Sequence, residues 1–312
     1  MNDEQKKDFK EIKKSLKELE DIISKTNLSD IKDITNTVAK ASGVYEKFPE
    51  SEKVANLYVS TLNTLVRRQF GLVDVTATVA KIHSIYEKFP ESEVVAYTYV
   101  HTLSILARLQ DSQADVTATV AKASDIYEKF PESELVASEY VQTLSTLARL
   151  QDSQADVAAT VAKVYDIYKK FYDFESVAYA YVKTLVYLAS RQDTKQDLME
   201  TFTEVINIYT EFSKKEFISS AFATVISEYI NNINSNFSNR GKVSVKERLK
   251  ILFNCLSNDN YELTEYIIGN IFYFNNGTDS FNSDTVSVTK EMFKIIIEFG
   301  VELTRYAPLI EL

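Results

Sequence analysis

The residues that most often carry chemistry are sparse in this chain. It holds two histidines, His83 and His101, and one cysteine, Cys255. Neither histidine lies in a spacing that would place two imidazoles on one face of a helix to bind zinc, so we expect both to be solvated. Cys255 lies in the apolar stretch Leu252–Leu256 with no adjacent histidine, which predicts a buried and inert thiol. The sequence predicts no catalytic residue, no metal site and no cofactor.

The glycines and the paired carboxylates also indicate no catalytic or phosphate-binding site. The six glycines are isolated from one another, whereas a phosphate-binding loop needs closely spaced glycines whose amides surround the phosphate. Carboxylate pairs such as Glu50/Glu52 and Glu132/Glu134 recur where helices are expected to begin, and favourable interaction with the helix dipole explains them there. We therefore expect a protein that is not an enzyme.

Composition and charge narrow the class of partner. The formal net charge of −10 opposes binding to nucleic acid or to an anionic membrane, since both need a cationic surface. No apolar run is long enough to span a bilayer, the charged start of the chain gives no secretory signal, and one cysteine allows no internal disulfide. These features predict a cytoplasmic protein whose partner is a protein or peptide, with no nucleic acid and no membrane. The oligomeric state stays open.

The sequence repeats with a period of 41 residues, and this repeat determines the elements that carry the residues above. Thr37–Lys40 returns as Thr78–Lys81 and twice more in the same register, and residues 108–116 and 149–157 are both RLQDSQADV. A constant register over five copies indicates a stacked array, in which each unit buries its apolar face against its neighbours. The repeat therefore predicts one elongated helical body.

Each copy contains two helical patterns, which the third copy shows best. Apolar residues between Val116 and Phe130 follow helical spacing, and Ser112 is a suitable N-cap. Pro131 ends this helix because proline cannot continue the hydrogen-bond ladder. A second helix is expected to begin near Ser133 and to end around Gln151. Each copy is thus predicted to be an antiparallel helical hairpin.

The array is expected to have a helical cap at either end. Residues 1–28 are predicted to form an N-terminal capping helix, residues 29–233 five hairpin repeats, and residues 234–312 a C-terminal helical cap outside the repeat. In the last segment we expect helices over residues 245–256, 263–274 and 286–306. The predicted fold class is all-α, an α-solenoid of stacked antiparallel helical hairpins that winds into a right-handed superhelix.

The order of elements resembles the tetratricopeptide repeat over roughly residues 30–230. In that family small residues pack the two helices, a tyrosine lies late in the second helix and a proline closes it, and Ala121, Tyr127 and Pro131 occupy comparable places. The period is 41 residues rather than about 34, and Leu144 is followed by Ser145 where the family has a Leu-Gly pair. A longer-helix variant, or an independent repeat of similar shape, fits both facts. The resemblance implies a scaffold that recognises a protein or peptide segment.

Variation among the copies predicts where such a partner binds. Positions of the second helix that change between copies fall in one narrow stripe when the helix is projected at about 100° per residue. The resemblance places this stripe in a concave groove, and an unconstrained solvated surface is the alternative. The candidate peptide-binding residues on the stripe or beside it are Tyr97, His101, Arg108, Gln142, Arg149, Tyr179, Lys183 and Tyr187.

Side-chain types along the stripe predict two anchors. Aromatic and cationic residues gather around Tyr97 and Tyr179, about two repeats apart, and such side chains dominate binding hot spots. Between them, Ser138 and Ser145 are expected to be exposed and small, which would let a ligand approach the backbone. Tyr127 and its register equivalents are instead predicted to pack between layers.

Arg67, Arg108 and Arg149 share one register position and admit two interpretations. Acidic neighbours such as Asp74, Asp115 and Asp156 could neutralise them in structural ion pairs, which we favour because stacked like charges repel. Alternatively, the guanidinium groups offer bidentate donors to the carboxylates of an acidic or C-terminal peptide. Two other functions stay open: a peptide-sensing regulatory protein that signals through the C-terminal helices, or an enzyme whose site lies in residues 243–312.

Overall fold

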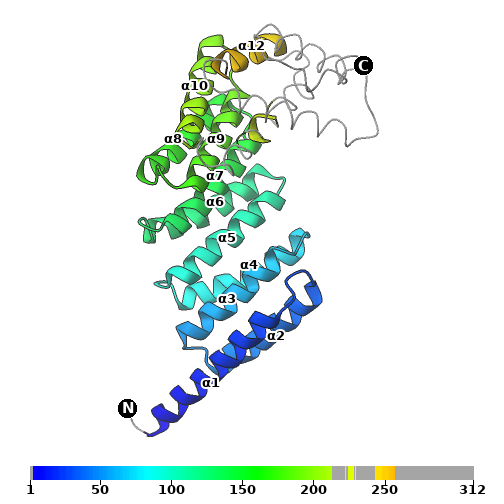
Figure 1. Ribbon diagram of the computed structural model, residues 1–312, viewed down its shortest axis with the longest axis vertical. Helices are drawn as coiled ribbons and strands as arrows, with labels where there is room; N and C mark the ends of the chain where they lie inside the picture. The colour runs from blue at the N-terminus through cyan, green and yellow to red at the C-terminus, as the bar shows by residue number, and fades with distance from the viewer. Residues whose placement is uncertain (1–2, 213–221, 223, 228, 230–242, 257–312) are drawn as a thin grey trace. The chain divides into compact units, whose positions relative to one another are not determined.

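The protein is helical in every regular element that its computed structural model describes, namely within residues 3–212, 222, 224–227, 229 and 243–256 (Figure 1). This confirms the predicted all-α fold of stacked hairpins. The chain divides into two compact units, Met1–Leu150 and Gln151–Leu312, and each is described by itself.

Unit 1 contains the N-terminal helix and three hairpins. Its helices are α1 (Asp3–Lys25), α2 (Ile31–Lys47), α3 (Glu52–Val66), α4 (Leu72–Lys88), α5 (Glu93–Leu109), α6 (Gln113–Lys129) and α7 (Glu134–Leu150). Unit 2 continues with α8 (Gln154–Lys170), α9 (Glu175–Ala189), α10 (Lys195–Phe212) and α12 (Val245–Leu256). The bounds of α6 and α7 match those predicted for the third copy, and α12 matches the first helix predicted for the C-terminal cap. The other two helices predicted there lie outside the described residues.

Each first helix ends in the same tight turn. Phe130 leaves the helical region with φ −121° and ψ 54°, and its carbonyl accepts a hydrogen bond from the amide of Ser133 at 3.1 Å. Phe171 adopts φ −121° and ψ 43° and accepts from Phe174 at 3.0 Å, although no proline follows it. Proline therefore reinforces a turn that the aromatic residue and its hydrogen bond already define.

One aromatic pair recurs inside the hairpins. The late tyrosine of the first helix packs on a ring of the second helix, with centroids 5.3 Å apart for Tyr127 and Tyr140 and 4.9 Å apart for Tyr168 and Tyr181. The same pair joins Tyr45 to Tyr58, Tyr86 to Tyr99, and Tyr209 to Phe222. Tyr86, Tyr168 and Tyr209 are buried, while Tyr45 and Tyr127 are half-buried. A packing role for this register position is confirmed, but these aromatic pairs lie within one hairpin rather than between layers.

A glutamine–threonine hydrogen bond ties each hairpin to the next first helix. The hydroxyl of Thr78 donates to Gln69 at 3.0 Å, that of Thr119 to Gln110 at 3.0 Å, and that of Thr160 to Gln151 at 2.9 Å. In unit 2 the amide of Gln192 donates to Thr201 at 2.8 Å. In each case the threonine lies nine residues after the glutamine, so the same local contact recurs at the start of four first helices.

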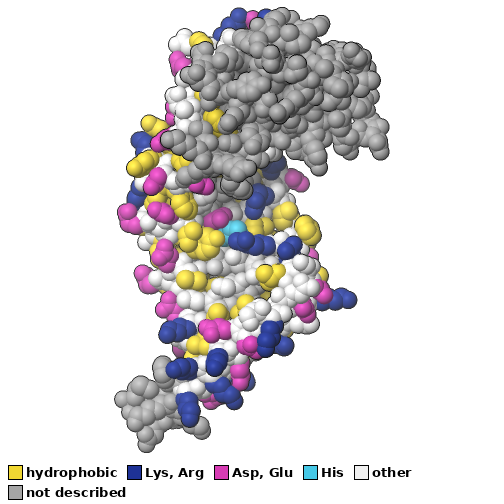
Figure 2. Space-filling view, viewed as in Figure 1, with side chains coloured by type: hydrophobic (Ala, Val, Ile, Leu, Met, Phe, Trp, Pro, Cys, Tyr) yellow, Lys and Arg dark blue, Asp and Glu magenta, His cyan; other side chains and the backbone are white. Residues whose placement is uncertain are grey.

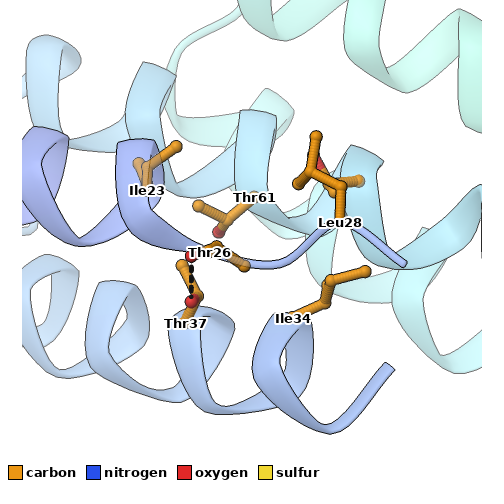
Figure 3. A pocket seen from close by; sticks show the side chains of 7 residues that line it. Ile23, Thr26, Leu28, Ile34, Thr37 and Thr61 are labelled. Atoms are coloured by element: carbon orange, nitrogen blue, oxygen red, sulfur yellow. Dashed lines mark hydrogen bonds between the residues drawn. The ribbon is translucent and has the colours of Figure 1, made fainter. Parts of the chain in front are cut away.

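The first hairpin lacks this glutamine, because Leu28 stands at its register position. The hydroxyl of Thr26 lies 2.7 Å from that of Thr37 instead, beside a cavity of about 20 Å³ between α1, α2 and α3 (Figure 3). A cavity of this size has room for a single water molecule and for no larger ligand.

Arg248 joins α12 to the end of α9 within unit 2. Its side chain is only 1% exposed, and its guanidinium donates to the carbonyl oxygens of Ala189 at 3.0 Å, Val243 at 3.2 Å and Gln192. A cation at the C-terminus of a helix compensates both the unpaired carbonyls and the negative end of the dipole. The arginine therefore has a structural role that its position in the sequence did not reveal.

The alanines on which the family resemblance partly rests are exposed rather than packed between the helices. Ala121 and its register equivalents Ala39 and Ala80 are exposed, so they do not pack the two helices together. Val120 and Ala123 are buried instead. Ala121 lies about 100° around the helix from Val120, beyond the edge of the packed face. This part of the resemblance is wrong.

Candidate functional site

The second helices of unit 1 pack closely side by side. Helix α5 lies against both α3 and α7, whereas no comparable packing joins α2 to α4 or α4 to α6, all of which the structure describes. Closer approach on one side bends a stack of hairpins toward that side. We call the exposed side of α3, α5 and α7 the second-helix face.

The second copy places its stripe residues at different depths on this face. Tyr97 is half-buried, Ser104 is buried and Arg108 is exposed, while the His101 side chain is only 12% exposed. The expectation of a solvated His101 is therefore wrong. The physical reason is that α5 is flanked by α3 and α7, so side chains at the margins of its stripe are covered by a neighbour.

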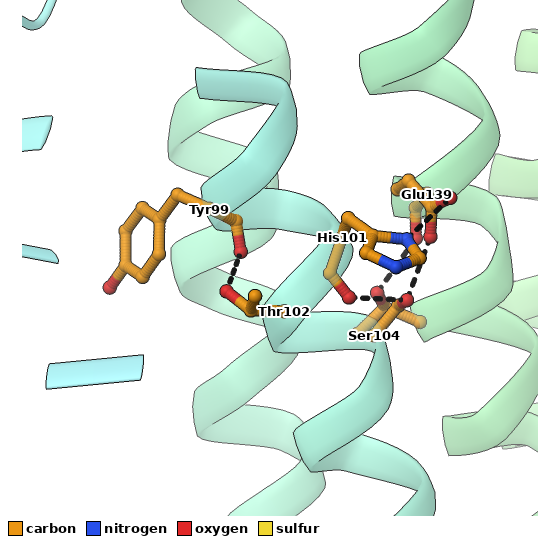
Figure 4. A network of polar contacts seen from close by, with 6 residues as sticks. Tyr99, His101, Thr102, Ser104 and Glu139 are labelled. Carbon is orange, nitrogen blue, oxygen red and sulfur yellow. Dashed lines mark hydrogen bonds and ion pairs between the residues drawn. The ribbon is translucent and has the colours of Figure 1, made fainter. Parts of the chain in front are cut away.

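His101 and Ser104 both contact Glu139, which projects from α7 (Figure 4). The imidazole Nδ1 of His101 lies 2.9 Å from one carboxylate oxygen, and the hydroxyl of Ser104 donates to the other at 2.7 Å. The Glu139 side chain is 16% exposed. Tyr99, whose ring joins the packed core, points to the opposite side of α5. The two sides of this helix thus serve different purposes.

The environment of Glu139 favours its ionised form. Burial alone raises the pKa of this carboxyl, but hydrogen bonds from His101 and Ser104 and the positive charges of His101 and Arg108 outweigh it. The pKa of Glu139 therefore lies below its ordinary value. When His101 is protonated, the two residues form a largely buried ion pair, and burying such a pair carries a desolvation cost.

Tyr97 extends the cluster toward α3. Its ring centroid lies 5.9 Å from that of His101. Burial raises the pKa of the Tyr97 hydroxyl, as does the charge of Glu139, and hydrogen bonding and positive charge from Arg67 act in the opposite direction. Three successive second helices therefore contribute to one polar cluster, which we call the Glu139 cluster: Arg67 from α3, Tyr97, His101, Ser104 and Arg108 from α5, and Glu139 from α7.

Sequence reasoning missed Glu139 although a signal was present. Its register position holds Leu57, Thr98 and Ala180 in other copies, so an acid occurs only here. The histidine it contacts is equally particular to its copy. Linking the two requires knowing that α5 and α7 pack together with this offset, which the repeat alone did not state.

In unit 1, Arg67 and Arg108 do not form ion pairs with the aspartates that were given as examples of their partners. Within the described residues no ion pair closer than 4.0 Å joins Arg67 to Asp74 or Arg108 to Asp115. Both guanidinium groups are on exposed residues, and their charges act on Tyr97 and Glu139 instead. The aspartates lie in the first turn of the following helix, where they complement its dipole.

In the third copy, two serines that were predicted to be exposed are buried. Ser138 and Ser145 are buried, Ser145 to 1% exposure, so they cannot let a ligand approach the backbone. Ser145 lies toward the margin of the stripe, as Ser104 does in α5, whereas Ser138 lies near its centre and is buried nonetheless. Gln142 is half-buried and Arg149 is exposed, so these two candidate residues keep accessible side chains.

The second predicted anchor lies in unit 2 on α9. Tyr179, Lys183 and Tyr187 are all half-buried, and the Lys183 ammonium lies 5.7 Å from the centroid of the Tyr179 ring. These residues therefore share one side of the helix with partly accessible side chains. The predicted separation of the two anchors stays a prediction.

Other chemistry-bearing residues form no site in the described part of the chain. No group of histidine, cysteine and carboxylate side chains suited to a metal ion occurs there. His83 is exposed and lies 3.5 Å from Glu87, which confirms its predicted solvation. Cys255 is half-buried rather than buried, and burial raises the pKa of its thiol.

Surface charge is mixed on the face that Figure 2 shows, where acidic and basic side chains are interspersed. Among the described helices, none has the length and apolar character that a bilayer crossing requires. The fold and this surface define an all-α helical-repeat protein. Comparison with protein-family models, curated proteins and solved structures gives no match.

Proposed function

We propose that the protein is a non-enzymatic repeat scaffold that binds a peptide or protein segment bearing carboxylates on its second-helix face. Arg67 and Arg108 would hold the carboxylates, and Tyr97 would pack against the chain of the ligand. The observation that carries the proposal is the Glu139 cluster, which holds Tyr97 and His101 between two exposed arginines.

The cluster is hard to explain by stability alone. A buried ion pair is often no more stabilising than apolar packing of similar volume, because both charges lose hydration. The register position of His101 holds Ser60, Gln142 and Lys183 in other copies, which fold into the same hairpin. In addition, Nε2 of His101 is buried with no hydrogen-bond partner among the described residues. Such an arrangement is typical of residues retained for binding.

Arginine is the side chain best suited to the proposed ligand. Its planar guanidinium forms two parallel hydrogen bonds to one carboxylate, and it keeps its charge at every physiological pH. Arg67 and Arg108 stand at one register position on adjacent helices, so they could bind carboxylates spaced along an extended peptide. Gln142 and Arg149 on α7 would extend the contact within unit 1, and Tyr179, Lys183 and Tyr187 on α9 would form a contact of their own in unit 2.

Peptide binding tests the proposal directly. A random library of synthetic peptides would be offered to the immobilised protein with free C-terminal carboxylates and, separately, with amidated termini. We expect retention of peptides with a free terminus or acidic side chains, and a loss of roughly tenfold in affinity for Arg108→Ala. Lys122→Ala is the matched control, since it removes one exposed cation from a first helix, α6. Equal binding of both libraries, or equal losses in both variants, would contradict the proposal.

A further inference from the structure

The loop between α3 and α4 exposes three apolar side chains. Phe70 is 88% exposed, Val73 81% and Leu72 43%. They are neighbours in sequence around Gly71, at the point where one hairpin passes to the next. Folded proteins rarely expose adjacent large apolar side chains unless these contact a partner.

The other copies show that the array does not need this sequence. Where this loop reads Phe-Gly-Leu-Val, the next two copies read Asp-Ser-Gln-Ala, and the fourth reads Asp-Thr-Lys-Gln. Arg68 also replaces a leucine, which stands there as Leu109 and Leu150. The fourth copy also has an arginine at this position, Arg191, so only the combination of a cation with large apolar side chains is particular to this loop among the four.

These substitutions change the local charge. Residues 67–74 contain two arginines and one aspartate, a net charge of +1, whereas residues 108–115 and 149–156 each contain one arginine and two aspartates, a net charge of −1. Residues 190–197 are neutral, with two cations and two aspartates. In a chain of net charge −10, this is the one cationic loop among the four.

The loop backbone would accept the sequence of the other copies. Gly71 has φ −94° and ψ 133°, and Ser112 at the same register position has φ −89° and ψ 125°. Ser112 caps α6 by accepting the amide of Asp115, whereas Gly71 offers α4 no side-chain cap. A Cβ on Gly71 would lie 3.3 Å from the carboxylate of Asp74, a flexible side chain that can yield. The apolar loop therefore lacks a cap that serine would supply, and its apolar side chains stay in water.

We propose that this loop, residues 67–73, is a docking surface for a partner protein segment that carries an apolar side chain flanked by acidic residues. The apolar side chain of the partner would cover Phe70 and Val73, and its carboxylates would pair with Arg67 and Arg68. A membrane surface fits less well, because the Asp74 carboxylate lies beside Gly71 in the loop and the chain as a whole is strongly acidic. This surface adjoins the Glu139 cluster and shares Arg67 with it, whereas Arg68, Phe70, Leu72 and Val73 belong to the loop alone.

The chain supplies its own test variant. Replacing Arg68→Leu, Phe70→Asp, Gly71→Ser, Leu72→Gln and Val73→Ala gives this loop the sequence of the next copy and keeps Gln69, which hydrogen-bonds Thr78. The reciprocal variant carries Leu109→Arg, Asp111→Phe, Ser112→Gly, Gln113→Leu and Ala114→Val, which builds a second apolar loop one repeat along. Circular dichroism and thermal melting check that both variants remain folded. If the multiple variant does not fold, Phe70→Ser alone replaces it in the binding measurement.

The probe is an array of 12-residue peptides in which the numbers of acidic and apolar residues vary independently. We expect the full chain to bind peptides that combine both types, the loop replacement to lose at least tenfold in affinity, and the reciprocal variant to gain binding. The native loop, the loop replacement and the reciprocal variant are compared in an Arg108→Ala background, which weakens acidic-peptide binding at the second-helix face, so that failure of the loop and failure of that face remain distinguishable.

Three results would overturn the proposal. The first is equal binding of all peptides by the native chain and the loop replacement. The second is loop-dependent binding to vesicles of phosphatidylcholine and phosphatidylserine in place of the peptides. The third is a concentration-dependent dimer, seen by analytical ultracentrifugation, that the loop replacement abolishes, which would assign the surface to a second copy of this chain.

Discussion

The packed side of each hairpin and the second-helix face follow different rules. On the packed side the same contacts recur in copy after copy, as in the aromatic pairs and the glutamine–threonine hydrogen bonds. On the second-helix face each copy carries its own residues, and one of them, Glu139, is largely buried with a histidine. The difference shows that repetition marks the contacts that build the array, while departures from it mark either solvent or function.

Removing a ring from the repeated aromatic pair should lower the free energy of unfolding more than any other change considered. Tyr140 is buried against Tyr127 and its hydroxyl donates to Ser124 at 3.1 Å. We expect Tyr140→Ala to lower the free energy of unfolding by roughly 3–5 kcal/mol, because it leaves a cavity between the two helices. Denaturant unfolding followed by circular dichroism measures this. A loss below about 1 kcal/mol would mean that the aromatic pair is not what holds the hairpin together.

Breaking the Glu139 cluster should have an intermediate and pH-dependent effect. Because its pKa in the folded protein lies below the ordinary value of 4.5, Glu139 adds stability that is present above that value and is lost as pH falls through its folded pKa. At pH 7 we expect Glu139→Gln to cost roughly 1–3 kcal/mol, since it leaves His101 and Ser104 with a weaker acceptor.

The pH dependence provides the check on that expectation. Unfolding of the native chain and of Glu139→Gln would be measured from pH 7 down to pH 3, and the difference should shrink below pH 4.5. His101→Gln, which restores the residue type of the third copy, is the matched variant. A difference that is constant over the whole range would show that the carboxylate charge contributes nothing.

The smallest effect is expected for one of the repeated polar contacts. Gln110→Ala removes the acceptor of Thr119, whose hydroxyl also donates to the carbonyl of Asp115 at 3.0 Å. Because the threonine keeps that second acceptor, we expect a loss of about 0.5–1.5 kcal/mol. Gln69→Ala should cost the same amount, and the two losses should add, as they do for distant sites. Unequal losses would show that the contact is not equivalent in each copy.

The hairpins, their bounds and the packed tyrosines could be predicted because a helix repeats its apolar contacts with a fixed period. The glutamine–threonine contact could not, although Gln110 and Thr119 are both in register, because polar spacing alone does not show which side chains meet. The burial of Ser145 was missed for a related reason. Projecting one helix ignores the helices on either side of it, and these cover the margins of a stripe that looks exposed.

Glu139 lay beyond sequence reasoning because its role depends on a contact between copies. His101 and Glu139 lie in different helices, and only the packing of α5 on α7 brings them together. The exposed loop at Phe70 was visible as a departure from the repeat, but its exposure became evident only in the folded chain.

The measurement that tests the central claim most directly compares binding with stability in Tyr97→Ala and Tyr140→Ala. Both remove a tyrosine ring from a second helix, one on the second-helix face and the other in the core. For a peptide selected with the native chain, Tyr97→Ala should weaken binding by roughly 1–3 kcal/mol and leave the melting temperature almost unchanged. Tyr140→Ala should lower the melting temperature strongly. If Tyr97→Ala unfolds the protein, or leaves peptide affinity intact, the second-helix face is not the binding site.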